Sequence, residues 1–89
     1  MHHVVWETRC ERDLKRMIGR GKDRGKFLDI VGLLKCDGRV PVQRHPHKLS
    51  GEYEGFWECH IESDWLLIYD VTEEEVLLVR TGTHADLFE

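Results

Sequence analysis

Residues 65–71 read WLLIYDV, a mostly apolar run whose length predicts a central β-strand rather than a buried helix. The run lies between FWECHI at residues 56–61 and VLLVRT at residues 76–81, which also have the composition of strands. Only short polar segments, residues 62–64 and 72–75, separate these neighbours, and such short turns join antiparallel strands. The second half of the chain therefore predicts a three-stranded antiparallel meander.

Helical periodicity precedes the meander. Thr8 and Glu11 have the spacing of a capping box and predict the start of a first helix. A second helix is predicted from about Asp23 to Cys36, and Gly38 is its expected stop. The apolar faces of the two helices consist of Cys10, Leu14, Met17, Ile18, Phe27, Ile30, Val31 and Leu34. The short connection between the helices predicts an antiparallel hairpin.

The remaining segments complete the predicted architecture. Residues 3–7 predict an edge strand, residues 39–54 an irregular stretch, and residues 83–89 a tail or a single helical turn. The order of strand, two-helix hairpin and meander predicts an α+β fold, with the helices on one face of a twisted antiparallel sheet. With 89 residues, the chain is expected to form a single domain, residues 1–89.

Composition excludes several classes of protein. No apolar run approaches the ~18 residues of a membrane span, and the first residues lack an apolar signal region. We therefore expect neither membrane association nor secretion. The three cysteines, Cys10, Cys36 and Cys59, are odd in number and form no CxxC pair, which predicts reduced thiols in a cytoplasmic protein.

Charge is unevenly distributed along the chain. The formal net charge is −4, but residues 1–48 carry 12 of the 13 basic residues and residues 49–89 carry 11 of the 17 acidic ones. Such asymmetry can mark one face for a polyanion or for an acidic partner. Two solvated surfaces of unlike composition would give the same pattern.

Side chains that can transfer protons or bind phosphate gather in the second half. They are His45, His47, His60, Asp64, Arg80 and His84. In the predicted meander, His60 and Asp64 flank one turn. Because residues 76–81 should run antiparallel to residues 65–71, Arg80 is expected opposite the end that begins at Asp64. His84 follows closely, so His60, Asp64, Arg80 and His84 are expected at one end of the sheet.

This set suits cleavage of an RNA phosphodiester. Histidine can remove or supply a proton near neutral pH, and arginine can bind the charged phosphorane. The 2′-OH supplies the nucleophile, so we expect neither a metal nor a cofactor. The aromatic rings of Trp65 and Phe88 could stack on bases.

Other readings of the same residues stay open at this point. Single histidines and arginines at strand ends are often surface residues, and Asp64 could be a turn residue. His45, His47, Cys59 and His60 are potential metal ligands, but they lack a recurrent zinc-site spacing.

Three blocks of sequence resemble the YafQ branch of the RelE/ParE toxin superfamily. They are an HxxxG block at residues 47–51, HIxxDWLLIY at residues 60–69 and RTGTHxDLF at residues 80–88. The basic first helix is a weaker match. The resemblance covers nearly the whole chain, and the order and spacing of the three blocks are specific.

The resemblance implies a bacterial type II toxin with the RelE fold. YafQ-like toxins are ribosome-dependent mRNA interferases, which are endoribonucleases that cut mRNA in the ribosomal A site and inhibit translation. The implied partners are the ribosome, mRNA and a cognate antitoxin. An antitoxin dimer would make the toxin–antitoxin complex a heterotetramer.

The resemblance also assigns catalytic positions in this sequence. His84 matches the histidine of Thr-His and is expected to be the general acid toward the 5′ oxygen. Asp64 or His60 is expected to be the general base on the 2′-OH. Arg80 matches the arginine of Arg-Thr-Gly and is expected to bind the phosphorane.

His47 completes the implied catalytic set, and two further positions are implied to bind the substrate. His47 matches the first family histidine and is expected to hold the phosphate or a neighbouring base. Trp65 and Phe88 match the tryptophan of Asp-Trp and the terminal phenylalanine, and they are expected to position the nucleotide.

The sequence departs from the family pattern near these positions. Pro46 stands where the family has aspartate, with His45 added before it, and Trp57-Glu58 replaces Arg-Asp. The acidic balance also differs from that of basic toxins. Two alternatives to the nuclease follow: a ParE-like toxin that inhibits gyrase, and a decayed toxin that only binds its antitoxin.

Overall fold

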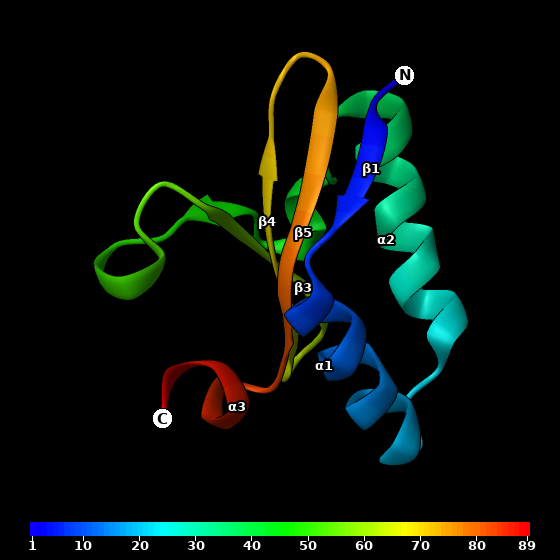
Figure 1. The fold of residues 1–89 in the computed structure, drawn as a ribbon, viewed down its shortest axis with the longest axis vertical. Coiled ribbons are helices and arrows are strands. Elements are labelled where there is room, and N and C mark those ends of the chain that lie inside the picture. Colours follow the sequence, from blue (N-terminus) through cyan, green and yellow to red (C-terminus); the bar gives the residue numbers. More distant parts are fainter.

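The computed structural model describes all residues, 1–89, and Figure 1 shows their arrangement. In chain order, the elements are β1 (His3–Trp6), α1 (Thr8–Gly19), α2 (Arg24–Asp37), the 3-10 turn η1 (Val42–Arg44), β2 (His47–Lys48), the 3-10 turn η2 (Gly51–Tyr53), β3 (Trp57–Glu62), β4 (Trp65–Val71), β5 (Glu75–Gly82) and α3 (His84–Phe88). The predicted α+β class, helical hairpin and meander are confirmed. None of the helices is both long and apolar enough to cross a membrane.

The five strands form one sheet in the order β1-β5-β4-β3-β2. Strands β2 to β5 pair antiparallel, as predicted for the meander of β3, β4 and β5, whereas β1 pairs parallel to β5. The expectation of a purely antiparallel sheet is therefore wrong for the edge strand. Parallel pairing is possible there because a long connection, which includes both helices, separates β1 from β5.

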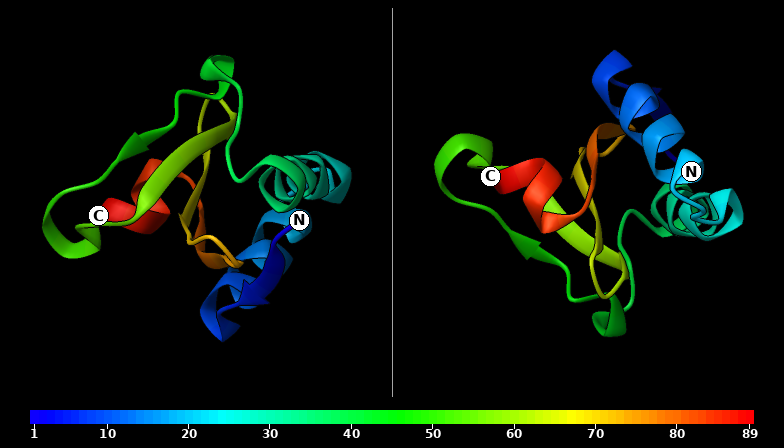
Figure 2. Two further views of the ribbon diagram at one scale, coloured as in Figure 1. Left: turned by 90° about the horizontal axis from the view of Figure 1, so that it is seen from above. Right: turned by 90° about the horizontal axis from the view of Figure 1, so that it is seen from below.

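Strand β4 is buried on both faces of the sheet. Trp65, Leu67 and Tyr69 pack in the main core against the helices, and Leu66 and Ile68 pack in a second cluster on the other face. Two-sided burial explains why the sequence of β4 shows no polar alternation. The strand thus separates a helical layer from a smaller layer that contains α3, as the two views in Figure 2 show.

Helices α1 and α2 begin and end for different local reasons. Glu7 has extended backbone angles and is the N-cap of α1, without a side-chain cap, so the predicted Thr8 capping box is wrong. Asp23 caps α2 by accepting a hydrogen bond from the Gly25 N–H. Gly38 ends α2 in the left-handed conformation, at φ 71°, as predicted.

The segments expected to be least regular contain short elements, and their residues Leu49, Tyr53 and Leu87 pack on the second face of the sheet. Residues 39–54 contain β2, whose two residues are too short to recognise from periodicity, and the turns η1 and η2. Residues 84–88 form the predicted single turn, α3. A capping box starts α3: the Thr83 hydroxyl accepts from the Asp86 N–H, and the Asp86 carboxylate accepts from the Thr83 N–H.

A buried ion pair joins α1 to β5. The Arg80 Nε and Nη2 donate to the Asp13 carboxylate at 2.6 and 3.0 Å, and the Thr81 N–H donates to it at 3.2 Å. Asp13 is 1% exposed and Arg80 is 5% exposed. The hydrogen bond to Asp13 raises the pKa of Arg80 further above its usual value, so the guanidinium stays charged.

Replacing Asp13 by alanine should strongly destabilise the fold, because it leaves a buried guanidinium without its counter-charge. We expect Asp13→Ala to lower the free energy of unfolding by about 3–5 kcal/mol in urea titrations. Asp29→Ala is the matched control, since Asp29 is an exposed aspartate on α2 and should shift stability by less than about 0.5 kcal/mol. Equal effects of the two variants would contradict a structural role for the pair.

The three cysteines are free thiols in two different environments. Cys10 and Cys59 are fully buried in the main core, and burial raises the pKa of each thiol to about 12. Cys36 is exposed on α2. Only the thiolate form is nucleophilic, so the buried cysteines should be unreactive.

Alkylation should therefore distinguish the cysteines. At pH 8, we expect iodoacetamide to modify Cys36 alone in the folded protein, and all three cysteines in urea, as measured by mass spectrometry. Cys36→Ser should abolish labelling of the folded protein. Rapid labelling of Cys10 or Cys59 without denaturant would show that the core opens readily.

Candidate active site

Four aromatic rings form a row on the second face of the sheet. In order, they are Phe88, His84, His60 and His45, with successive ring centroids 6.3, 6.1 and 5.4 Å apart. The row joins α3 to the middle of β3 and to the end of η1. The predicted proximity of His60 and His84 is thus confirmed, and we call these four residues the ring row.

His84 is held by Asp64. The Asp64 Oδ1 accepts a hydrogen bond from the His84 backbone N–H at 3.0 Å and lies 2.8 Å from His84 Nδ1. These bonds lower the pKa of Asp64, with the backbone bond as the larger cause, so the carboxylate is ionised at neutral pH. A carboxylate at Nδ1 fixes the hydrogen there, which leaves the Nε2 of His84 available to a substrate.

A charged clamp fixes α3, and therefore His84, against α1. Arg20 donates to the Asp86 carboxylate at 2.6 and 3.1 Å, and Asp86 also accepts from the Thr83 N–H at 3.0 Å. The contact with Arg20 lowers the pKa of Asp86. A Cβ on Gly82 would lie 2.9 Å from the Asp86 Cβ, so this close approach requires glycine.

Arg80 does not lie where the sequence predicted. It pairs with Ile68, and Gly82 takes the position opposite Leu66. A one-residue irregularity at Val79 shifts the register along β5, and the shift could not be foreseen from turn lengths.

The guanidinium of Arg80 is also largely occupied. Besides its two bonds to Asp13, it donates from Nη1 to the Tyr53 hydroxyl at 3.1 Å. The Tyr53 ring in turn meets the Phe88 ring edge-on, with centroids 5.9 Å apart. These three bonds occupy the guanidinium of Arg80, which is 5% exposed, so the open fork expected for a phosphorane is not present.

Trp65 is not available to a nucleotide. Its side chain is fully buried on the helical face of β4, where it stacks against Phe27. Its Nε1–H donates to the Thr81 hydroxyl at 2.9 Å. The expected substrate contact is therefore wrong for Trp65, since the alternation along β4 turns this residue away from the ring row. Phe88, by contrast, is 47% exposed at one end of the row.

His47 lies on β2, paired with Glu58 of β3. Its Nδ1 is 3.0 Å from the His45 carbonyl oxygen and its Nε2 is 3.4 Å from the Glu58 Oε1. Both ring nitrogens thus face acceptors, and the ring can donate to both only when each nitrogen carries a hydrogen. His47 is exposed, whereas the Glu58 carboxylate is buried and its Oε2 has no hydrogen-bond partner.

Sequence reasoning missed the supporting residues of this site. Glu58 precedes His60 by two residues in a strand, so their shared face could have been recognised from the alternation of β3. No local pattern indicated that Asp13 and Tyr53 would meet Arg80. Residues that come from α1 and η2 are brought there only by the tertiary fold.

The potential metal ligands do not converge. Cys59 is buried in the main core, whereas its neighbour His60 faces the ring row. The structure brings together no group of three or more histidine, cysteine or acidic side chains that could hold a metal ion.

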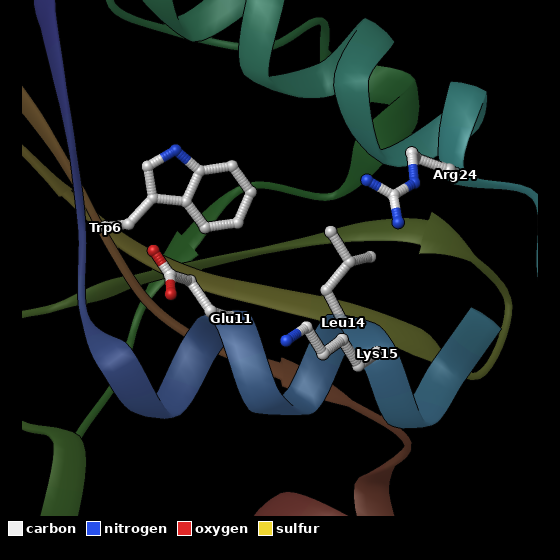
Figure 3. A pocket seen from close by; sticks show the side chains of 5 residues that line it. All are labelled: Trp6, Glu11, Leu14, Lys15 and Arg24. Atoms are coloured by element: carbon white, nitrogen blue, oxygen red, sulfur yellow. The ribbon is translucent and has the colours of Figure 1, made fainter. Parts of the chain in front are cut away.

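A separate hollow of about 190 Å³ lies on the helical side of the molecule. Figure 3 shows its lining side chains, which come from β1, α1 and α2 and are Trp6, Glu11, Leu14, Lys15 and Arg24. None of the predicted site residues lines this hollow, so the ring row remains the candidate active site.

Comparisons with known proteins identify the family of the chain. Residues 2–89 match the family model described as bacterial toxin of type II toxin-antitoxin system, YafQ. The chain is 37% identical over 86 residues to the mRNA interferase toxin YafQ of Escherichia coli strain K12, which covers 96% of the chain and 94% of the relative. It is 29% identical over 69 residues to a putative YafQ toxin of Haemophilus influenzae, covering 74% of the chain and 68% of the relative.

Solved structures give the same assignment. Crystal structures of YafQ from E. coli strain BL21(DE3) and of the E. coli DinJ–YafQ complex superpose with TM-scores of 0.92 and 0.90, at 30% and 31% identity, and cover 100% of both chains. A metal-bound toxin from Helicobacter pylori gives a TM-score of 0.88 at 31% identity, covering 99% of this chain and 100% of that one. The chain therefore belongs to the YafQ family of bacterial type II toxins.

Proposed function

We propose that the chain is an mRNA interferase that cuts mRNA on the ribosome by metal-free acid–base chemistry. The observation that carries the proposal is the pair of neighbouring imidazoles, His60 and His84, with Asp64 behind His84. Relatives named mRNA interferase toxin YafQ support the same activity.

The reaction needs one proton removed and one supplied. In our proposal, His60 accepts the proton of the 2′-OH while the 2′ oxygen attacks phosphorus. The bond from phosphorus to the 5′ oxygen breaks, and His84 gives that oxygen a proton from its Nε2. The products are a 2′,3′-cyclic phosphate and a 5′-OH end, and no metal is required.

Asp64 is better suited to positioning His84 than to acting as the general base. One of its oxygens already accepts from the backbone and lies against the ring of His84, and its lowered pKa makes it a poor proton acceptor. A carboxylate behind an imidazole also stabilises the imidazolium form. We therefore assign the base to His60.

His47 and Arg80 take different supporting roles. The exposed ring of His47 has the His45 carbonyl at Nδ1 and the Glu58 carboxylate at Nε2, so in our proposal it donates to a phosphate oxygen by turning its Nε2 away from Glu58. Arg80 holds Tyr53, which supports Phe88 at the end of the ring row. We assign nucleotide stacking to Phe88 and a positioning role to Arg80.

The ribosome and an antitoxin are the proposed partners. Arg9, Arg12, Lys15 and Arg24 are exposed on the two long helices and could meet ribosomal RNA. Arg20, Lys22 and Lys26 are instead bonded to Asp86 or Glu62. By analogy with the DinJ–YafQ complexes, we propose a cognate antitoxin that neutralises the toxin in the cytoplasm, in a heterotetramer with an antitoxin dimer. Neither gyrase inhibition nor a decayed site would require this arrangement of imidazoles.

Cell-free bacterial translation tests the activity. With primer extension as the readout, we expect in-frame cuts in the mRNA only when ribosomes are present. His84→Ala should slow cleavage by about 10²–10⁴-fold, since it removes the proposed acid. His3→Ala is the matched control, because His3 is an exposed histidine on β1 and should leave cleavage unchanged. Cuts in naked RNA would remove the ribosome from the mechanism, and undiminished cleavage by His84→Ala would refute its role.

Trp65→Phe should separate stability from catalysis. The substitution removes the buried bond to Thr81, so we expect the free energy of unfolding to fall by about 1–3 kcal/mol. Cleavage by the folded variant should proceed at the wild-type rate, because Trp65 does not reach the ring row. A large loss of cleavage without a loss of stability would instead support direct contact with the nucleotide.

A further inference from the structure

His45 has an unusual backbone conformation. It is the one non-glycine residue with a positive φ, at 54°, and it directly follows η1. Histidine enters this region at an energetic cost, and such residues tend to occur at functional sites.

Neighbouring contacts hold this conformation. The His45 N–H donates to the Val42 carbonyl at 3.0 Å, and the His45 carbonyl faces His47 Nδ1 at 3.0 Å. The adjacent Arg44 donates from Nη1 to the Ile61 carbonyl at 3.1 Å, which ties the turn to β3. The turn therefore presents an exposed imidazole at a defined position beside the candidate active site.

The His45 ring extends the site beyond the proposed catalytic pair. It meets His60 edge-on at 67°, so His60 has His45 as one ring neighbour and His84 as the other. A hollow of about 390 Å³ opens beside it, lined by His45, His60, Gln43 and Ser63 among others. Its rim thus combines imidazole rings with an amide and a hydroxyl, which can meet the edge of a base.

We propose that His45 and this hollow form a subsite for the nucleobase that flanks the scissile phosphate on the His60 side. The inference rests on the proposed ribonuclease function. Unstacked RNA bases bind aromatic side chains by stacking, one base to each ring surface. With His60 and His84 engaged at the phosphate, the two ends of the ring row, His45 and Phe88, receive the two flanking bases.

The subsite predicts an effect on binding that is separate from chemistry. His45→Asn removes the ring while keeping a residue that tolerates the left-handed conformation. On ribosomes programmed with mRNA that carries a 2′-O-methyl group at the scissile nucleotide, we expect this variant to bind on the order of tenfold more weakly than the wild type. With unmodified mRNA, this variant should need on the order of tenfold more toxin than the wild type to reach half of its maximal single-turnover cleavage rate. His3→Asn is the matched control and should match the wild type in both measurements.

A fluorescent base locates the contact. We would place 2-aminopurine on either side of the scissile phosphate in the 2′-O-methyl mRNA and measure its emission when toxin binds. We expect quenching by His45 at one flanking position only, and loss of that quenching in His45→Asn. Equal binding and equal quenching by His45→Asn and wild type would overturn the subsite.

The same preparation separates this inference from the proposed function. Absence of cleavage of unmodified mRNA by the wild type would refute the ribonuclease proposal. Normal cleavage by the wild type, together with wild-type binding by His45→Asn, would refute only the subsite.

Discussion

The buried ion pair between Asp13 and Arg80 connects the parts of the molecule that the candidate site requires. Asp13 belongs to α1, Arg80 to β5, and the guanidinium also holds the hydroxyl of Tyr53 from η2. Charges buried this deeply are tolerated only when they are paired and hydrogen-bonded. Burying either charge without its partner would cost free energy, so Asp13 and Arg80 must stay together in the folded protein. The pair thereby links the helical layer to the loop that supports Phe88.

Strand β4 imposes the second constraint. Its two buried faces divide the molecule into a core beneath the helices and a smaller cluster beneath α3. Successive residues along a strand therefore point to different clusters. Trp65 and Cys59 pack in the main core, whereas His60 faces the ring row. Neighbours in sequence consequently have unrelated roles.

Acidic residues account for much of how the site is assembled. Asp86 binds Arg20, Glu62 binds Lys22 and Lys26, and Asp64 orients His84. The lysine contacts lower the pKa of Glu62 to about 2, so this carboxylate stays ionised down to strongly acidic pH. The acidic second half of the chain is therefore partly bonded to the basic first half.

The local sequence pattern was sufficient to predict the meander, the two long helices and the end of α2 at Gly38, because periodicity and short turns depend on residues close in sequence. The order of the strands in the meander was then sufficient to bring His60 near His84. The local pattern could not place the parallel β1, which pairs with a distant segment, or the bulge at Val79, which shifts Arg80 along β5 and is not indicated by turn lengths. The burial of Trp65 and the meeting of Asp13, Tyr53 and Arg80 were likewise decided by tertiary packing. Such contacts form because three separate elements pack against one another, and the residue spacing within any one element does not indicate them.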